Sequence, residues 1–203
     1  MGDNNSVMDD TVPSTPSPPT KSAIGTGPIR LGTPSRIILL GEGGSGKTFM
    51  ADSFLRRFKR VLVITTDPTE FSWCPNRVVT VDTETVLANM EKAFKAGNIM
   101  VVIDDADVYF TRFEDDNRLK TILAVGRHRN CGWCIMTRRT QDLPPLCFKQ
   151  ANKVFIFQTD YPNDLALYED FYMVSAEVKN LNREAHECLF IDRETREKRV
   201  LVA

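Results

Sequence analysis

One short glycine-rich segment has the residue types and the spacing of a phosphate-binding loop. It matches the pattern G-x-x-x-x-G-K-[ST] in full, and its residues are Gly41, Glu42, Gly43, Gly44, Ser45, Gly46, Lys47 and Thr48. In this pattern glycine N–H groups surround phosphates, the lysine reaches the β- and γ-phosphates, and the Ser/Thr hydroxyl binds Mg²⁺. A strand pattern precedes the segment and a helix pattern follows it, which is the context that such a loop requires. The segment therefore predicts a site for a nucleoside triphosphate with Mg²⁺.

An apolar run further along the chain, MVVI, ends in the acids Asp104 and Asp105. A carboxylate at the end of a strand beside a phosphate loop commonly holds the metal ion. We expect Asp104 to hold Mg²⁺, directly or through water, and Asp105 to polarise the water that attacks the γ-phosphate. Asp107 lies close by, and for this residue a simple capping role is a reasonable alternative.

The segment GRHRNCGWCIMTRRTQDLPP places cations on both sides of the short apolar run WCIM. Buried strands are normally bounded by turn residues, so cations at both ends indicate an anion nearby. Arg127 and Arg129 precede the run, while Arg138 and Arg139 follow it. The second pair is interpreted either as solvated strand-end residues or as contacts to DNA or to a neighbouring subunit. His128 is expected to pack or to form hydrogen bonds rather than to catalyse.

Alternating strand and helix patterns surround these segments. Uniformly apolar strands that alternate with helices predict a mainly parallel sheet in a three-layer α/β fold, and the last segment alternates around a polar turn as a β-hairpin does. The expected strands are residues 36–40, 60–66, 77–81, 99–104, 131–137 and 153–157, the expected helices are residues 48–60, 83–96 and 117–126, and the hairpin spans residues 187–203.

Composition limits the class of protein. The chain has 203 residues, of which 42% are hydrophobic, so one α/β domain is expected. Its formal net charge of -1 gives no global basic field for nucleic acid, and any anion site must be local.

The five cysteines fit a reduced protein, and Cys131 and Cys134 are interpreted as core residues of one strand rather than as a redox or metal pair. No apolar run is long enough for a transmembrane segment.

Residues 1–34 differ from the rest of the chain. They contain six of the eleven prolines, with many Ser, Thr, Asp and Gly residues and few large apolar ones. Such a composition cannot bury a core, so we expect a flexible tail followed by one P-loop domain at residues 35–203. The tail either solubilises the protein or tethers it to a partner.

From about Arg36 to Phe157 the chain resembles the FtsK–HerA superfamily of P-loop ATPases. Within that superfamily it is most similar to the genome-packaging ATPases of tailless icosahedral viruses with internal membranes. The resemblance depends on GEGGSGKT, VLVITTDPTEF, MVVIDD and GRHRNCGWCIMTRRTQDLPP. It implies a RecA/ASCE-like fold in which the strand before Gln141 lies between the phosphate-loop strand and the Walker B strand that ends at Asp104.

The resemblance also implies roles for particular residues. Gln141 would sense the γ-phosphate or the attacking water of ATP, and Arg127 or Arg129 would act in trans on the site of a neighbouring subunit. These ATPases commonly have Asp-Glu where this chain has Asp104 and Asp105, so Glu42 is a second candidate to polarise the water.

The implied protein is a ring of five or six copies that moves double-stranded DNA into a preformed capsid. It would be located in the host cytoplasm or on the virion, and its tail could reach a capsid or membrane vertex protein. Arg112, helped by Arg138 or Arg139, is the expected DNA contact.

Two other functions remain open. A P-loop nucleotide or small-molecule kinase would need an acceptor pocket and an arginine-rich lid, and no separate lid insertion is evident. A GTPase is disfavoured, because the sequence Asn152-Lys153-Val154-Phe155 lacks the Asp of the guanine motif. An assembly protein that binds ATP without hydrolysing it is favoured if Asp105 cannot act as a base.

Overall fold

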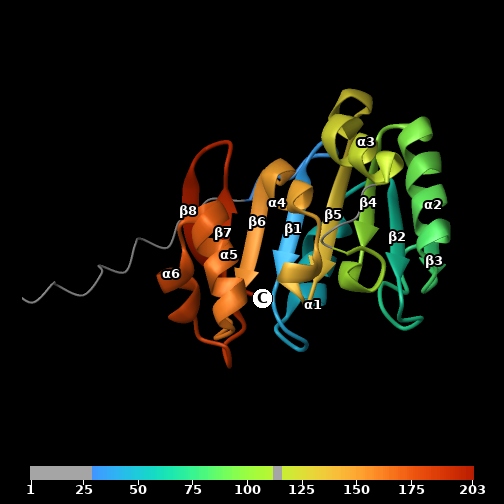
Figure 1. Ribbon diagram of the computed structural model, residues 1–203. Coiled ribbons are helices and arrows are strands. Elements are labelled where there is room, and N and C mark those ends of the chain that lie inside the picture. Colours follow the sequence, from blue (N-terminus) through green and yellow to red (C-terminus); the bar gives the residue numbers. More distant parts are fainter. Residues whose placement is uncertain (1–28, 112–115) are drawn as a thin grey trace, which may run out of the picture.

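The computed structural model describes residues 29–111 and 116–203, and a single eight-stranded sheet runs through them in the order β3-β2-β4-β5-β1-β6-β7-β8 (Figure 1). Strands β1 to β6 run parallel to one another, whereas β7 runs antiparallel to β6 and forms an antiparallel hairpin with β8 at one edge. The strands are β1 (Arg36–Leu40), β2 (Val61–Thr65), β3 (Arg77–Val79), β4 (Ile99–Ile103), β5 (Cys131–Thr137), β6 (Lys153–Phe157), β7 (Glu187–Asp192) and β8 (Glu197–Val202).

The central strands are buried along their whole length, as their uniformly apolar sequences predicted. Every residue of β4, β5 and β6 is buried. A parallel strand of this kind needs cover on both faces, and helices supply most of it. The expected α/β three-layer arrangement with a C-terminal β-hairpin is therefore confirmed.

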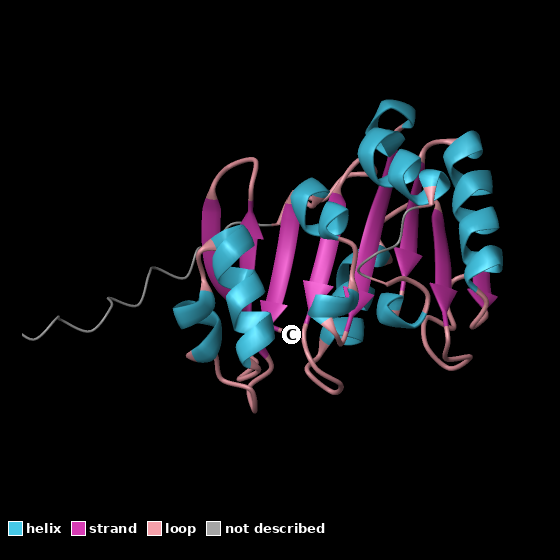
Figure 2. Ribbon diagram, in the orientation of Figure 1, coloured by secondary structure: helices cyan, strands magenta, loops and turns pink. Residues whose placement is uncertain are grey.

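Helices cover the two faces of the sheet unequally (Figures 1 and 2). One core contains side chains of α2 to α6, and the other contains side chains of α1 together with the loop between β2 and β3. Helix α2 begins where predicted, because the Asp82 carboxylate accepts a hydrogen bond from the Thr85 N–H, and it ends at Gly97. The helices are α1 (Lys47–Leu55), α2 (Thr83–Ala96), α3 (Asn117–Val125), α4 (Pro145–Gln150), α5 (Pro162–Tyr172) and α6 (Ser175–Lys179).

Helix α1 is shorter than its sequence pattern predicted. It stops at Leu55 rather than at residue 60. The next N–H groups, of Arg57 and Phe58, bond three residues back, which tightens the last turn so that the chain can reverse into β2. Helices α4, α5 and α6 had no predicted counterpart. No helix in residues 29–111 and 116–203 has the length and apolar character of a membrane span.

Strand β5 lies between β1 and β4, which is the strand order that the resemblance implied. Cys131 and Cys134 both lie on this strand but belong to different cores, so they point to opposite faces of the sheet. Neither forms a disulfide. The interpretation of Cys131 and Cys134 as two core residues is confirmed. Strand β5 also separates the two arginine pairs that precede and follow it.

Candidate active site

The phosphate-binding loop joins the carboxyl end of β1 to helix α1. Two of its glycines have left-handed backbone conformations, with φ values of 72° at Gly44 and 102° at Gly46. A side chain at Gly46 would also be crowded, because its Cβ would lie 3.0 Å from the Cβ of Ala203. Glycine alone adopts this backbone without strain, and the resulting curl lets successive N–H groups face an anion.

Lys47 lies folded against the loop that precedes it. Its Nζ donates hydrogen bonds to the carbonyl oxygens of Gly41 and Glu42, each at 2.8 Å, and the residue is 7% exposed. Burial lowers the pKa of Lys47, while the charges of Asp105 and Asp104 oppose that change. A buried cation in a glycine-rich loop at a helix N-terminus is suited to binding phosphate oxygens.

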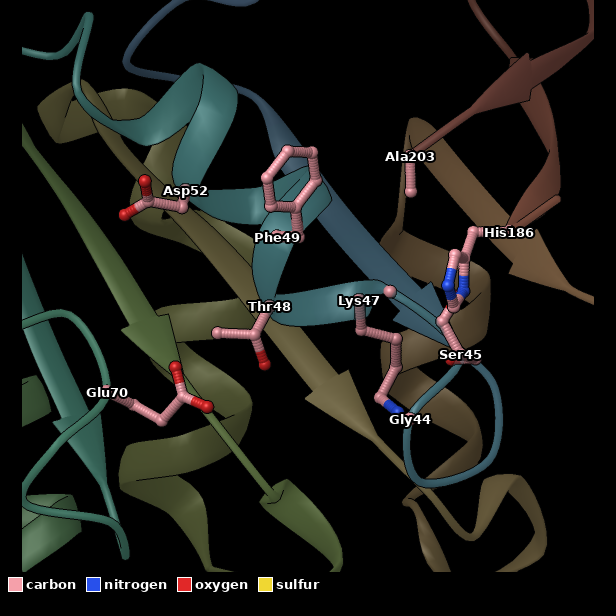
Figure 3. Close-up of a pocket in the computed structure, with 10 residues that line it drawn as sticks. Gly44, Ser45, Lys47, Thr48, Phe49, Asp52, Glu70, His186 and Ala203 are labelled. Carbon is pink, nitrogen blue, oxygen red and sulfur yellow. The ribbon is translucent and has the colours of Figure 1, made fainter. Parts of the chain in front are cut away.

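A cavity of about 690 Å³ opens beside the loop (Figure 3), a volume that suits a nucleotide. The hydroxyl of Ser45 is buried in the loop and has no hydrogen-bond partner among the described residues, so a phosphate oxygen could satisfy it. The Nδ1 atom of His186 lies 3.3 Å from the Ser45 carbonyl oxygen. The lining residues are Gly44, Ser45, Gly46, Lys47, Thr48, Phe49, Asp52, Glu70, His186 and Ala203.

Several lining residues were not identified from the sequence. Glu70 comes from the loop between β2 and β3, and His186 and Ala203 come from the two ends of the hairpin. Figure 3 shows the Glu70 carboxylate turned toward Thr48 and the His186 ring beside the phosphate loop. No local pattern marks these residues, because only the strand order brings their segments to the loop.

Asp104 lies at the end of β4 next to the phosphate loop. It is 5% exposed, and its carboxylate accepts a hydrogen bond of 3.2 Å from the Thr65 hydroxyl. Burial, reinforced by the charge of Asp105, raises the pKa of Asp104 to about 6. A buried carboxylate that is costly to ionise, and whose charge acts on Lys47 of the phosphate loop, fits a site for Mg²⁺, whose charge would favour the ionised form.

Asp105 has a left-handed backbone with φ 48°, which is uncommon outside glycine. Its carboxylate accepts a hydrogen bond of 3.3 Å from the Thr66 hydroxyl and lies 3.2 Å from Nε of Arg138. The sequence had placed Arg138 only in solvent, on DNA or at an interface. The structure instead pairs the Arg138 guanidinium with the carboxylate of Asp105, the residue expected to act as the base.

Asp107 does more than cap its own segment, contrary to the alternative considered from the sequence. Its Oδ1 accepts hydrogen bonds from the Thr137 hydroxyl at 2.9 Å and from the Arg138 N–H at 3.1 Å. The loop after β4 is thereby joined to the end of β5.

Gln141 lies in a short 3₁₀ helix (Thr140–Asp142) just after β5. Its side chain is exposed, and its Oε1 accepts a hydrogen bond of 3.2 Å from Asn163. Gln141, Arg138 and Arg139 line a second cavity, of about 630 Å³, together with Glu42 and Gly43 of the phosphate loop. Gln141 therefore lies beside the phosphate loop, in the region where a γ-phosphate sensor is needed.

Glu42, the second candidate to polarise water, already has two partners. Its carboxylate accepts a hydrogen bond of 3.2 Å from the Thr159 hydroxyl and lies 2.8 Å from Nη2 of Arg183. The Glu42 carboxylate is thus held by a threonine hydroxyl and an arginine, as the Asp105 carboxylate is.

Arg127 and Arg129 lie at the opposite end of β5, in the 3₁₀ helix Gly126–Arg129. The seven residues of β5 separate them from the phosphate site by about 20 Å. Arg129 donates a hydrogen bond of 3.1 Å to the Lys95 carbonyl oxygen and stacks over Phe94 at 5.4 Å. The side chain of Arg127 has no hydrogen-bond or ion-pair partner within the described part of the chain. Arg112, the expected DNA contact, lies outside the described residues.

Comparison with known proteins finds relatives by structure. No family model matches the sequence, and no curated protein sequence matches it either. The genome packaging NTPase B204 from Sulfolobus turreted icosahedral virus 2, in complex with sulfate, aligns with a TM-score of 0.73 and 20% identity over 84% of this chain and 96% of that one. The same NTPase has also been solved in complex with ATP-gammaS, with a TM-score of 0.69 and 20% identity over 82% and 96%.

Two further structures have the same architecture. B204, the DNA-packaging ATPase from Sulfolobus turreted icosahedral virus, aligns with a TM-score of 0.67 and 21% identity over 83% of this chain and 97% of that one. The N-terminal domain of zonular occludens toxin from Neisseria meningitidis aligns with a TM-score of 0.54 and 13% identity over 83% and 94%. The chain therefore has the three-layer P-loop NTPase fold that these proteins share, as the resemblance to FtsK–HerA ATPases predicted.

Proposed function

We propose that the chain hydrolyses ATP to ADP and phosphate and uses the energy to move double-stranded viral DNA into a preformed capsid. One observation carries the ATPase part: Lys47, Asp105 and Gln141 come from three different connections and lie together at the carboxyl edge of the sheet. Ligands of open α/β sheets bind at this edge. The similarity in fold to genome-packaging NTPases supports the packaging part.

In this proposal the phosphate loop and Lys47 bind the triphosphate, and Lys47 exchanges its contacts with Gly41 and Glu42 for phosphate oxygens. Thr48 and Asp104 would hold Mg²⁺, which neutralises charge on the phosphates when it is bound. Asp105 accepts a proton from the attacking water. Water then bonds to the γ-phosphorus as the bond from that phosphorus to the bridging β–γ oxygen breaks, and ADP leaves. Gln141 orients the water or the γ-phosphate.

A ring of copies would complete the site. The exposed Arg127 and Arg129 lie too far from the phosphate loop of their own chain to reach it. An arginine supplied by a neighbour stabilises charge on the transferred phosphoryl group. Arg129 is held by Lys95 and Phe94, whereas the side chain of Arg127 has no such contact with the described residues, and this difference supports Arg127 as the arginine that acts in trans.

DNA would be held by a few cations at the centre of the ring, with Arg112 and Arg139 as candidates. With a net charge of -1, the chain should contact few phosphates, so DNA affinity should fall only gradually with salt and depend little on sequence. Residues 1–34 would tether the motor to a capsid or membrane vertex protein, on the virion or in the host cytoplasm.

The test is a measurement of ATP turnover with and without double-stranded DNA, beside a screen of nucleotide and small-molecule phosphate acceptors. The proposal expects phosphate release that DNA stimulates, and no phosphorylated acceptor. Transfer to an acceptor would instead establish the kinase alternative, which the fold relatives do not favour. Nucleotide binding without turnover in either condition would indicate an assembly protein that does not hydrolyse ATP.

A further inference from the structure

The contact between Arg138 and Asp105 joins the ends of two neighbouring strands beside the phosphate loop. Nε of Arg138 lies 3.2 Å from Oδ1 of Asp105, and Thr66 donates to the other carboxylate oxygen at 3.3 Å. The Asp105 N–H in turn donates to Oδ1 of Asp104 at 3.1 Å. Asp105 is thus held in an uncommon backbone conformation by contacts on both sides of its carboxylate.

The backbone of Arg138 is fixed, but its side chain is not enclosed. The Arg138 N–H and the neighbouring Thr137 hydroxyl both donate to Asp107, and the Thr137 carbonyl oxygen accepts from the Gly41 N–H at 3.3 Å. These contacts tie the start of the arginine side chain to the first residue of the phosphate loop. The side chain itself is 47% exposed, so the guanidinium can change partner without any movement of the backbone.

The surroundings of Arg138 indicate which partner is within reach. Arg138 lines the cavity of about 630 Å³ whose wall includes Glu42 and Gly43 of the phosphate loop. The cation of Arg138 also opposes the charged form of Lys47, whose ammonium group is the one that reaches the γ-phosphate in such loops. A γ-phosphate bound by Lys47 would therefore lie near the guanidinium.

The chemistry favours an exchange. A terminal phosphate has more negative charge and more acceptor oxygens than a carboxylate, and the planar guanidinium binds such groups through two parallel hydrogen bonds. Asp105 and a γ-phosphate therefore compete for the same cation.

We propose that Arg138 is a γ-phosphate sensor within its own chain: its guanidinium pairs with the Asp105 carboxylate until a γ-phosphate displaces that carboxylate. This inference rests on the proposed ATPase function. It assigns a role in nucleotide discrimination to a residue that the sequence alone left in solvent, on DNA or at an interface. ADP has no γ-phosphate, so the ion pair between Arg138 and Asp105 should persist when ADP is bound.

The test compares wild type with Arg138→Gln and uses Arg196→Gln as the control, since Arg196 is an exposed arginine of the hairpin turn and lines neither of the two cavities beside the phosphate loop. Affinity for a non-hydrolysable ATP analogue and for ADP is measured by calorimetry with Mg²⁺. Arg138→Gln should weaken analogue binding roughly 10- to 100-fold, as expected for a charge-assisted hydrogen bond, and leave ADP binding nearly unchanged. Arg196→Gln should change neither affinity.

A second variant tests the competition itself. Asp105→Asn should strengthen analogue binding, because Arg138 no longer has a competing carboxylate, and the gain should shrink in the double variant with Arg138→Gln. Thermal unfolding of each variant shows whether it is folded.

Several outcomes would overturn the inference. An unchanged ratio of analogue to ADP affinity in folded Arg138→Gln would leave the arginine as a structural partner of Asp105. An equal loss of DNA affinity with that ratio intact would make Arg138 a DNA contact. If wild type binds ADP and analogue and Arg138→Gln alters neither, the inference fails while the proposed function stands. If wild type binds no nucleotide, both fail.

Discussion

The two ends of β5 have similar sequences and different surroundings. Arg127 and Arg129 precede the strand, and Arg138 and Arg139 follow it. At the carboxyl end, Arg138 contacts Asp105 beside the phosphate loop. At the amino end, Arg129 donates to a backbone carbonyl and stacks over the ring of Phe94. The side chain of Arg127 has neither an ion pair nor a hydrogen bond to any described residue.

The difference shows that the direction of a strand decides what its flanking cations can do. In a parallel sheet the carboxyl ends of neighbouring strands meet at one edge, so Arg138 is brought to the acids that follow β4 and to the loop that follows β1. Arg127 and Arg129 at the amino edge form no ion pair with an acid among the described residues. If they act on a phosphate, that phosphate belongs to another molecule.

The largest expected effect is at the carboxyl edge. Lys47→Ala removes the cation of the phosphate loop, so ATP turnover should fall roughly 10³-fold or more, and nucleotide binding should weaken strongly. The fold should persist, because the lost contacts are to two carbonyl oxygens of the loop itself. Turnover by phosphate release and thermal unfolding check this, with the exposed Lys59→Ala as control. A loss of folded protein would show that Lys47 is primarily structural.

At the amino edge, Arg127→Ala should leave ATP binding nearly intact and reduce turnover by roughly 10³- to 10⁵-fold, because an arginine in trans acts on the transition state. Arg129→Ala serves as the comparison within the pair, and Arg196→Ala, in the exposed hairpin turn, is the neutral control. Turnover and nucleotide affinity are measured for all three.

Mixing variants distinguishes the two edges directly. Arg127→Ala subunits mixed with Lys47→Ala subunits should regain some activity, since each supplies what its neighbour lacks. Gln141→Ala subunits mixed in the same way should not, because Gln141 and Lys47 belong to one site. If neither arginine variant is complemented, and dilution leaves specific activity unchanged, the two edges do not cooperate between subunits.

Substitution of Asp104 and of Asp105, the two acids after β4, should affect different steps: Mg²⁺ binding and hydrolysis, respectively. Asp105→Asn should keep binding of ATP with Mg²⁺ but reduce turnover roughly 10²- to 10⁴-fold, as loss of a general base does. Asp104→Asn should instead raise the Mg²⁺ concentration needed for half-maximal turnover. A Mg²⁺ titration of both variants checks this, with the exposed Asp170→Asn as control. Full turnover in Asp105→Asn would assign the base to another carboxylate.

The smallest effect concerns the crowding of acids at the carboxyl edge. Burial, followed by the charges of Glu42 and Asp142, raises the pKa of Asp164 to about 6. The native state therefore binds this proton more tightly than the unfolded chain, whose Asp has a pKa of about 4. The resulting stabilisation is complete below about pH 4 and is lost as the pH rises to about 6.

Asp164→Asn removes the cost of ionising a buried carboxyl. At pH 7.5 the variant should be more stable than wild type by about 1 to 3 kcal/mol, and at pH 4 the two should be nearly equal. Denaturant unfolding at both pH values measures the difference, with the exposed Asp160→Asn as control. A destabilised variant at pH 7.5 would mean that the ionised carboxylate is needed by a partner.

Much of the fold could be predicted from the sequence because the signals are local. The glycine spacing of the phosphate loop, the apolar run before Asp104 and the Asp82 cap of α2 are each contained within a few residues. Helices α4 and α6 were missed because they have only 6 and 5 residues, and α5 was missed because it starts at a proline and has no clear apolar period.

For the site, the sequence alone determined the phosphate loop, the acids after β4 and the presence of arginines on both sides of one strand. It did not determine the ion pairs of Arg138 with Asp105 and of Arg183 with Glu42. Nor did it determine that the His186 ring would lie against the Ser45 carbonyl oxygen. Each of these contacts joins residues that are more than 30 positions apart, and strand order and register alone bring them together. A pattern within a segment fixes which groups are available, whereas the packing of strands into one sheet decides which charges become neighbours.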